Sequence, residues 1–224
     1  MTGRTFAIGD IHGCEIALDG VLSQIRPGAD DTLVVLGDVI DRGPNTARCI
    51  EILMAVKQKC NMILVMGNHE EMLFEAFETG IPNSRWIRYG GQEMVASYGG
   101  RVQNIPRPHV DFLADAVPFY ETDDTLFVHA NVDPDLPPGE QSIECLRWRH
   151  LTGFELPHSS GKRVICGHTP LKTGLPQVFE GWVAIDTWAY GGMFLTAIDV
   201  GSNEIFQANQ TGFTRGGVTL DDLL

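Results

Sequence analysis

The sequence predicts an α/β (α+β) protein whose parallel sheet is followed by a second, strand-rich half. In the first third of the chain, short apolar runs alternate with helical patterns, which gives three strand–loop–helix units in succession. The second half contains several strand candidates with few helices between them, which indicates a second sheet. The length of 224 residues, 43% of them hydrophobic, fits one domain with a sizeable core.

The first three units follow one another without a linker. Their predicted strands are short and apolar: Thr5–Ile8, Thr32–Leu36 and Met62–Met66. Their predicted helices follow the strands: Glu15–Ile25, Thr46–Lys57 and Glu70–Phe77. Asn45 and Thr46 are both candidate N-caps of the second helix. Because each strand is followed by a helix, the three strands are expected to run parallel.

The rest of the chain is less regular at first and then rich in strands. Residues from about 82 to 117 contain short helical stretches and several glycines, and we interpret them as a helical insertion and a candidate cap over the site. The later strand candidates are Thr125–Val128, Arg163–Cys166, Trp182–Ile185, Met193–Asp199 and Glu204–Ala208. The tail, residues 214–224, is expected to be peripheral. One domain over residues 1–224 is therefore predicted.

Charge and cysteine content limit the classes of partner. The chain has 29 acidic against 16 basic residues, a formal net charge of -13, so it repels a phosphate backbone and is not expected to bind nucleic acid. Its five cysteines are odd in number, form no C-x-x-C pair and follow an N-terminus without an apolar signal region, which favours reduced thiols and a cytoplasmic location. No apolar run is long enough for a membrane span, and no membrane partner is expected.

Ligand-type side chains follow five of the predicted strands. They occur as Gly9-Asp10, Gly37-Asp38, Gly67-Asn68, His129 and Gly167-His168. Active sites of α/β sheets gather at the carboxyl ends of the strands, and a glycine before each ligand allows a sharp turn without a Cβ in the way. We therefore expect these side chains to meet at one edge.

The candidate donors are oxygen and nitrogen atoms with no thiolate among them. They are Asp10, His12, Asp38, Asn68, His129 and His168. Such a set suits divalent manganese, iron or zinc. Asp38 can bridge two ions, and a pair about 3.5–4 Å apart clamps a phosphoryl oxygen and lowers the pKa of a bound water. Two such ions would also reverse the local charge of an acidic protein, so a phosphate substrate is compatible with the composition.

Three further residues suit phosphoryl transfer. His69 can protonate a leaving alkoxide, Asp41 can hold His69 in the right tautomer, and Arg42 offers a fork of donors to phosphate oxygens. Each has an ordinary alternative: an Asp after a strand commonly caps a helix, a lone buried His is commonly a core residue, and Asn68 can simply be the cap of the next helix. The agreement of all the motifs, in order and each after an apolar strand, favours a site.

These motifs together resemble those of the bacterial phosphoprotein phosphatase family, within the calcineurin-like metallophosphoesterases. G-D-I-H-G at 9–13, G-D-V-I-D-R-G at 37–43 and G-N-H-E at 67–70 are similar to its three signature motifs. V-H-A at 128–130 and G-H-T-P at 167–170 resemble its two downstream histidine motifs. The resemblance extends from Ile8 to about Gly192, and the short chain is similar to the compact bacterial and phage members, the phage lambda phosphatase among them.

The resemblance implies a four-layer fold, with a central β-sandwich flanked by helices, and two divalent ions, with manganese expected and iron or zinc as alternatives. It implies Asp10, His12 and Asp38 for the first metal. For the second metal it implies Asp38, Asn68, His129 and His168. It also implies His69 with Asp41 as the general acid pair and Arg42 as a phosphate-binding residue. In Leu146-Arg147-Trp148-Arg149-His150, Arg149 aligns with a second phosphate-binding arginine and Arg147 is its rival.

Some residues depart from the family pattern or stand outside its motifs. Trp188 occupies a position where the family often has glycine, so it is expected either to pack in the core or to restrict the substrate. His109, His150 and His158 lie in loop-like sequence and are expected at the surface, with His150 the one to examine for a contact with the site.

The resemblance implies a protein Ser/Thr phosphatase, with Tyr as a further substrate, acting by direct attack of a dimetal-bound hydroxide on a phosphoprotein or phosphopeptide. The alternative is a symmetrical bis(5'-nucleosyl)-tetraphosphatase; those enzymes typically lack the aspartate of D-R-G and read G-N-H-D, whereas this chain has Asp41 and Glu70. A metal-binding scaffold without turnover is a third class, and it is disfavoured because no ligand and no acid is missing. The sequence does not give an oligomeric state.

Overall fold

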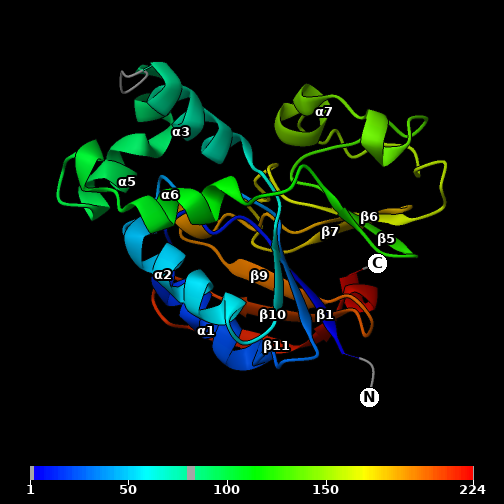
Figure 1. Cartoon of the computed structure of the whole chain (residues 1–224). Helices are drawn as coiled ribbons and strands as arrows, with labels where there is room; N and C mark the ends of the chain where they lie inside the picture. The colour runs from blue at the N-terminus through cyan, green and yellow to red at the C-terminus, as the bar shows by residue number, and fades with distance from the viewer. Residues whose placement is uncertain (1–2, 80–83, 224) are drawn as a thin grey trace.

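Two β-sheets face each other, and helices cover their outer faces (Figure 1). The computed structural model describes residues 3–79 and 84–223. The strands of the first sheet are β1 (Thr5–Ile8), β2 (Thr32–Val35), β3 (Asn61–Leu64), β9 (Leu195–Asp199), β10 (Glu204–Ala208) and β11 (Thr214–Thr219). Those of the second are β4 (Tyr120–Glu121), β5 (Thr125–Phe127), β6 (Arg163–Cys166), β7 (Gln177–Phe179) and β8 (Trp182–Ala184).

The helices lie between these strands in the chain. The α-helices are α1 (Glu15–Ile25), α2 (Thr46–Lys57), α3 (Asn68–Thr79), α4 (Ser84–Trp86), α5 (Gln92–Ser97), α6 (Arg107–Ala114) and α7 (Ile143–Trp148). A π-helical segment, η1 (Ile87–Gly91), joins α4 to α5 and is kinked at Gly90, whose φ of 115° is not helical. The 3-10 turns are η2 (Val102–Asn104), η3 (Pro138–Glu140), η4 (Ala189–Gly191) and η5 (Leu220–Leu223).

The strand order explains why the carboxyl ends of several strands gather in one place. The first sheet has the order β11-β10-β9-β1-β2-β3, and β1, β2 and β3 are parallel, as the three strand–loop–helix units predicted. The second sheet has the order β4-β5-β6-β8-β7, and β5, β6 and β8 are parallel. The first sheet therefore has a parallel half that ends at β3 and an antiparallel half that ends at β11, whereas the second sheet has a parallel centre with an antiparallel strand at each edge.

Alternation along the central strand β1 divides the core into layers. Phe6 and Ile8 pack with helices α1 and α2, whereas Ala7 packs in the cluster between the sheets, with Phe127 and Ile165 of the second sheet. This is the period of two that a strand covered on both faces requires. A third cluster, which includes Leu146 of α7, covers the far face of the second sheet. The predicted fold of four layers, a β-sandwich flanked by helices, is confirmed.

Some elements differ from the prediction. The tail is peripheral, as expected, but it also forms a strand that was not predicted: β11 pairs antiparallel with β10 at the edge of the first sheet. The short strands β4 and β7 were not predicted, because they lack the buried apolar run that marks the similarly short β5 and β8. Residues 82 and 83 of the predicted insertion lie outside the described residues. The limits of the single domain stay a prediction.

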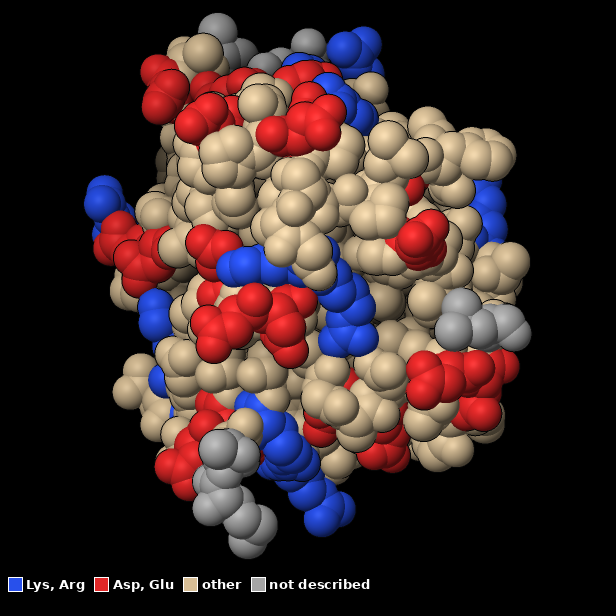
Figure 2. Space-filling model, turned by 90° about the vertical axis from the view of Figure 1, so that its right-hand side faces the viewer, with Lys and Arg blue, Asp and Glu red and all other residues tan. Residues whose placement is uncertain are grey.

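Two surface properties accord with the composition. Within the described ranges, no helix is long and apolar enough to cross a membrane. On the face shown in Figure 2, acidic and basic side chains lie interspersed, and the visible described residues form no broad basic patch. The five cysteines are buried and free of disulfides, which is consistent with the expected reduced thiols.

Candidate active site

The register of the strands brings the predicted ligands to one edge of the sandwich. Ile8 of β1 pairs with Val35 of β2, which pairs with Leu64 of β3, so these strands end level with one another. In the second sheet Phe127 pairs with Ile165. The six predicted donors all follow these strand ends and are buried: Asp10, His12, Asp38, Asn68, His129 and His168.

Hydrogen bonds join the two sheets across this edge. His129 Nδ1 bonds the Leu36 carbonyl oxygen at 2.8 Å, and the His168 backbone N–H donates to both carboxylate oxygens of Asp10 at 3.1 Å. A Cβ at Gly167 would collide with the Asp10 carboxylate. Glycine is therefore required at Gly167 by close approach, whereas at Gly37 a φ of +98° requires it.

Backbone strain is concentrated in the same loops. Five predicted site residues are in the left-handed region, with φ between 45° and 70°: His12, Asp38, Asp41, Arg42 and His168. This conformation is unfavourable for residues with a Cβ, and it persists where the surrounding structure enforces it. Glu70 contributes here, because its carboxylate accepts from the backbone N–H groups of Asp38 and Val39 at 2.9 Å.

The hydrogen bonds of three histidines fix where their lone pairs lie. The outer nitrogens of His12, His129 and His168 bond the carbonyl oxygens of Ile40, Leu36 and Trp148 at 2.8–3.0 Å. A carbonyl only accepts, so each outer nitrogen carries the proton and each inner nitrogen carries a lone pair. Burial also lowers the pKa of His129 to about 3 and that of His168 to about 2, which keeps both rings neutral.

The inner lone pairs converge on other acceptors. His129 Nε2 and His168 Nδ1 lie 3.0 and 3.1 Å from Asn68 Oδ1. His12 Nε2 lies 3.5 Å from Asp38 Oδ2, and His129 Nε2 lies 3.5 Å from Asp38 Oδ1. Lone pairs at these separations repel unless a cation lies among them. The arrangement therefore fits divalent metal ions, with Asp38 shared by both histidine groups, and each ligand histidine is held by a backbone carbonyl.

We call the six candidate donors the cage. Its two carboxylates, together with the nearby Asp186, point to the same conclusion. Burial, together with the charges of Asp186 and Asp38, raises the pKa of Asp10 well above its usual value. Burial likewise raises the pKa of Asp38 and of Asp186 to about 7 each. Asp186 Oδ2 is buried and has no hydrogen-bond partner in the described part of the chain. A cluster of buried carboxylates is costly without cations, and bound metal ions reverse that cost.

His69 differs from the other histidines because its outer nitrogen faces a carboxylate. Its Nδ1 lies 2.7 Å from Asp41 Oδ2, and both side chains are fully buried. Its Nε2 has no hydrogen-bond partner among the described residues and lies 3.9 Å from Asp38 Oδ2. Burial raises the pKa of Asp41 and lowers the pKa of His69, which favours an uncharged pair that holds two protons. One proton lies in the hydrogen bond between Nδ1 and Asp41 Oδ2, and the second is presented at Nε2 toward the cage.

Arg42 is fixed at the mouth of the cage. Its backbone N–H donates to the Gly90 carbonyl at 3.1 Å, and its Nε donates to the Tyr89 carbonyl at 3.4 Å. Its guanidinium lies 4.6 Å from the centre of the Tyr190 ring and 3.2 Å from His12 Nε2. The side chain is therefore held in place while its terminal nitrogens remain at the cavity.

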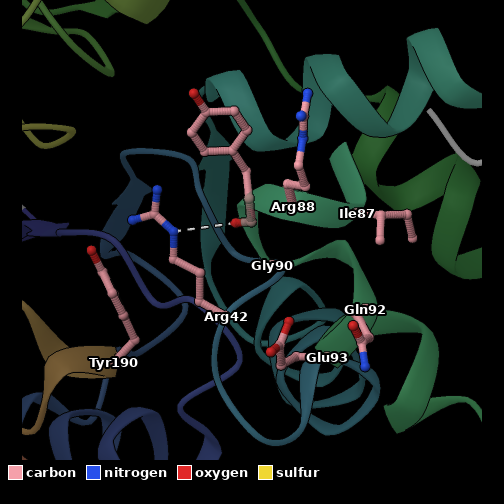
Figure 3. A pocket seen from close by; sticks show the side chains of 8 residues that line it. Arg42, Ile87, Arg88, Gly90, Gln92, Glu93 and Tyr190 are labelled. Atoms are coloured by element: carbon pink, nitrogen blue, oxygen red, sulfur yellow. Dashed lines mark hydrogen bonds between the residues drawn. The ribbon is translucent and has the colours of Figure 1, made fainter. Parts of the chain in front are cut away.

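A cavity of about 240 Å³ lies over the cage. Its lining residues are Asp38, Arg42, Asn68, Arg85, Tyr89, Trp148, His150, His168, Pro170 and Tyr190. A second, larger groove of about 530 Å³ shares Arg42, Tyr89 and Tyr190 with it. Figure 3 shows Arg42 extending toward Tyr190 on one side of this groove, with Arg88 and Glu93 on segments across from it. The cage therefore opens into a groove large enough for groups beyond a phosphate.

The two arginines weighed for the second phosphate contact are placed differently. Arg147 is half-buried and pairs with Glu71 at 3.0 Å, whereas Arg149 is exposed. Neither is among the described residues that line the cavity; Arg85, whose guanidinium lies 4.3 Å from the centre of the Trp148 ring, is among them. The assignment of phosphate binding to Arg149 stays a prediction.

The residues outside the motifs require corrections. His150 is exposed, as expected, and it contacts the site because its ring centre lies 4.5 Å from that of His168. The surface prediction was wrong for His109 and His158: His109 bonds the Tyr98 hydroxyl, and His158 bonds the Leu136 carbonyl, both buried. Their polar partners are distant in sequence or in irregular loops, which local patterns do not reveal. Trp188 is half-buried beside Tyr190, whose ring lines the cavity instead.

Sequence reasoning missed several residues of the site, above all Trp86. Trp86 Nε1 donates to both carboxylate oxygens of Asp41 at 3.1 Å. Arg85 and Tyr190 line the cavity, but neither belongs to a motif. The tryptophan and Arg85 lie in the segment interpreted as a helical insertion and a candidate cap over the site, but no spacing rule connects these two residues with Asp41 or Arg42. A lone aromatic residue in such a segment carries no functional signal by itself.

Two facing sheets whose parallel strands deliver these donors to one buried cage form a candidate metal centre. The chain belongs to the family described as calcineurin-like phosphoesterase, whose sequence model matches residues 3–179. This confirms the family predicted from the five motifs.

Curated relatives have different printed activities. One relative is serine/threonine-protein phosphatase 1 of Salmonella typhimurium, which is 37% identical over 89 residues, or 39% of each chain. Another is a symmetrical bis(5'-nucleosyl)-tetraphosphatase of Pectobacterium carotovorum, 25% identical over 154 residues, or 61% of this chain and 47% of that one. The matches cover 26% to 47% of the relatives' own length.

Solved structures share the fold. A protein provisionally named diadenosine tetraphosphatase superposes with a TM-score of 0.69 at 21% identity, over 97% of this chain and 95% of that one. A cold-active protein tyrosine phosphatase superposes with a TM-score of 0.68 at 16% identity, over 96% and 79% of the two chains. At these identities the structures establish the common fold, and the substrate has to be argued from the site.

Proposed function

We propose that the protein is a metal-dependent phosphoprotein phosphatase that hydrolyses phosphate monoesters on Ser or Thr, with Tyr as a further substrate. The observation that carries the proposal is the buried pair of His69 and Asp41 beside the metal cage, joined at 2.7 Å. A monoester of serine or threonine leaves as a strongly basic alkoxide, which needs a proton as it departs. An anhydride leaves as a weakly basic phosphate, for which such an acid is far less important.

The proposed mechanism assigns a task to each group. Asp10, His12 and Asp38 would hold one metal ion, and Asp38, Asn68, His129 and His168 the other. When bound, the ions supply positive charge for the phosphoryl oxygens and activate a water as the nucleophile. We expect manganese to serve, with iron or zinc as alternatives, because the donors are oxygen and neutral imidazole nitrogen.

The remaining steps belong to side chains of the chain itself. Arg42 binds phosphoryl oxygens through its terminal nitrogens, held at the cavity by the Tyr89 and Gly90 carbonyls. His69 delivers the proton of Nε2 to the leaving oxygen while Asp41 stabilises its tautomer at Nδ1. The groove beyond Arg42 receives the remainder of the substrate, which supports a phosphoprotein or phosphopeptide as the partner.

The alternative is a symmetrical dinucleoside tetraphosphatase. It is supported by the relative from Pectobacterium carotovorum and by the superposition over 97% of this chain. We favour the phosphoprotein phosphatase because Asp41 and Glu70 are both present, and because both take part in the site through buried hydrogen bonds.

A direct competition assay tests this choice. The manganese-loaded enzyme is given a phosphoserine peptide, a phosphotyrosine peptide and diadenosine tetraphosphate in separate reactions, and kcat/KM is measured for each. We expect a phosphopeptide to have the highest value. A higher kcat/KM for diadenosine tetraphosphate than for either peptide would reverse the assignment. Turnover of none of the three, with metal bound, would favour a scaffold.

A further inference from the structure

Trp86 lies fully buried behind the general acid pair, and no motif includes it. Its indole Nε1 is 3.1 Å from Asp41 Oδ1 and 3.1 Å from Asp41 Oδ2. Asp41 Oδ2 in turn bonds His69 Nδ1 at 2.7 Å. All three residues are fully buried, with a relative exposure of 0%. They form one continuous chain of hydrogen bonds, from indole to carboxylate to imidazole.

The geometry of this chain fixes the orientation of the imidazole. A carboxylate rotates freely about its last bond, and an N–H shared between its two oxygens sets the plane of the group. With that plane fixed, Oδ2 of Asp41 meets Nδ1 of His69, and the ring then directs Nε2 toward the cage, 3.9 Å from Asp38 Oδ2. Partners of this kind orient a functional histidine without touching the substrate.

The segment that carries Trp86 is packed to hold the ring in this place. A Cβ at Gly91 would lie 2.5–2.7 Å from three atoms of the Trp86 ring, so only glycine allows the π-helical turn η1 to cover it. A Cβ at Gly90, where φ is +115°, would lie 2.5–3.0 Å from the backbone N, Cα and side-chain Cγ of Arg42. The segment η1 therefore packs against both of the adjacent residues Asp41 and Arg42. It contacts Arg42 directly, and it contacts Asp41 through the Trp86 ring.

We propose that Trp86 is a positioning residue for proton delivery: its N–H aligns Asp41 so that His69 protonates the leaving group. The inference rests on the proposed function, since it needs His69 to be the acid. Loss of the indole N–H should slow reactions whose leaving group needs a proton. It should have little effect on reactions whose leaving group does not need one.

Two aryl phosphates separate these cases. Phenyl phosphate has a basic leaving group, and 2,4-dinitrophenyl phosphate has a weakly basic one. With the manganese-loaded enzyme, we expect Trp86→Phe to lower kcat/KM for phenyl phosphate about tenfold and for 2,4-dinitrophenyl phosphate less than about twofold. His69→Asn, measured in parallel, gives the full size of the leaving-group effect.

A matched control is available in the second sheet. Trp182 is also buried, and its Nε1 donates to the Leu156 carbonyl at 3.0 Å, away from the acid pair. Trp182→Phe removes the same atoms from a core position, so any loss of activity should be equal for the two substrates. If Trp86→Phe fails to fold, benzothienylalanine at position 86 keeps the shape of the indole while replacing the N–H by sulfur.

Each result has a defined meaning. A loss that is larger for phenyl phosphate in the position-86 variant, and absent or uniform in Trp182→Phe, supports the proposal. Equal losses for both substrates, or no loss, at position 86 overturn it while His69 keeps its leaving-group effect. If His69→Asn itself shows no leaving-group effect, or if the wild-type enzyme hydrolyses neither ester, the proposed function fails and this inference fails with it.

Discussion

The two ends of the same parallel strands carry buried carboxylates in opposite electrostatic states. At the amino ends, Asp31 before β2 pairs with Arg4 before β1 at 2.7 Å, and this hydrogen bond lowers the pKa of Asp31 to about 2. At the carboxyl ends, burial raises the pKa of Asp38 to about 7, and that of Asp10 is raised as well. At the amino ends the carboxylate charge of Asp31 is stabilised by Arg4. At the carboxyl ends the charges of Asp10 and Asp38 are opposed by burial.

This difference indicates how stability and function are divided along a strand. The amino ends are closed by a salt bridge and backbone hydrogen bonds, which contribute to folding. The loops at the carboxyl ends contain residues with left-handed backbone conformation. Histidine lone pairs there face the side-chain oxygen of Asn68, and buried carboxylates lie close together. Such features persist because the sheets and their buried clusters hold them, and a bound cation is what they fit. The comparison predicts that changes at the two ends affect different properties.

The largest effect is expected for the acid at the carboxyl ends. His69→Asn removes the proton donor and should lower kcat/KM for a phosphoserine peptide by roughly 10³-fold. Manganese binding should be unchanged, as measured by isothermal titration. His109→Asn is the control, because His109 is a buried histidine that bonds Tyr98 far from the cage, and it should retain nearly full activity. Wild-type kcat/KM in His69→Asn would show that the acid is misassigned.

A smaller loss is expected for the guanidinium at the cavity. Arg42→Ala removes charge-assisted hydrogen bonds to the phosphoryl group worth about 3 kcal/mol, so kcat/KM should fall about 100-fold. Arg149→Ala and Arg85→Ala, assayed beside it, compare the arginine predicted from sequence with the one that lines the cavity. We expect both losses to be smaller than that of Arg42→Ala, and a larger loss in either would displace Arg42 as the main phosphate contact.

The sequence predicts those site residues that follow a local pattern, and it does not predict those that depend on contacts distant in sequence. Asp10, Asp38 and Asn68 could be found because each follows an apolar strand, and parallel strands end at one edge. Their positions follow from the pattern of apolar residues in each strand, and this pattern can be read from a short stretch of sequence. Trp86 could not be found, because its hydrogen bonds to Asp41 join residues 45 apart through an irregular helical segment. The fold was predictable for the same reason, except for the short strands β4 and β7 and the edge strand β11.

Metal binding should stabilise the folded protein, because the cations offset the cost of burying carboxylates at the carboxyl ends of the strands. Manganese at 100 times its dissociation constant should raise the free energy of unfolding by about 2.7 kcal/mol, or the melting temperature by about 5–10 °C over a sample with chelator. Asp38→Asn should abolish this increase and, in chelator, should melt above the wild type because a buried charge is removed. If the wild type and Asp38→Asn melt alike with and without manganese, the cage does not bind the ion.

The smallest effect is expected at the amino ends, and it should depend on pH. Because the pKa of Asp31 is about 2 in the folded protein against an ordinary 3.8, its pairing stabilises the fold fully above about pH 4, and this contribution is lost as the pH falls through 2. Asp31→Asn should lower the free energy of unfolding by about 1 kcal/mol at pH 7, since Arg4 is half-exposed and water screens the pair.

Denaturant titrations at pH 7, 4 and 2.5 measure this difference, which should shrink toward the lowest pH because the wild-type carboxylate becomes protonated there. Asp115→Asn is the control, since its pair with Lys57 is exposed and should contribute little at any pH. Activity of the manganese-loaded Asp31→Asn enzyme at pH 7 should equal that of the wild type. A marked loss of activity would mean that the two ends of the strands are coupled, and the division between stability and function would not hold.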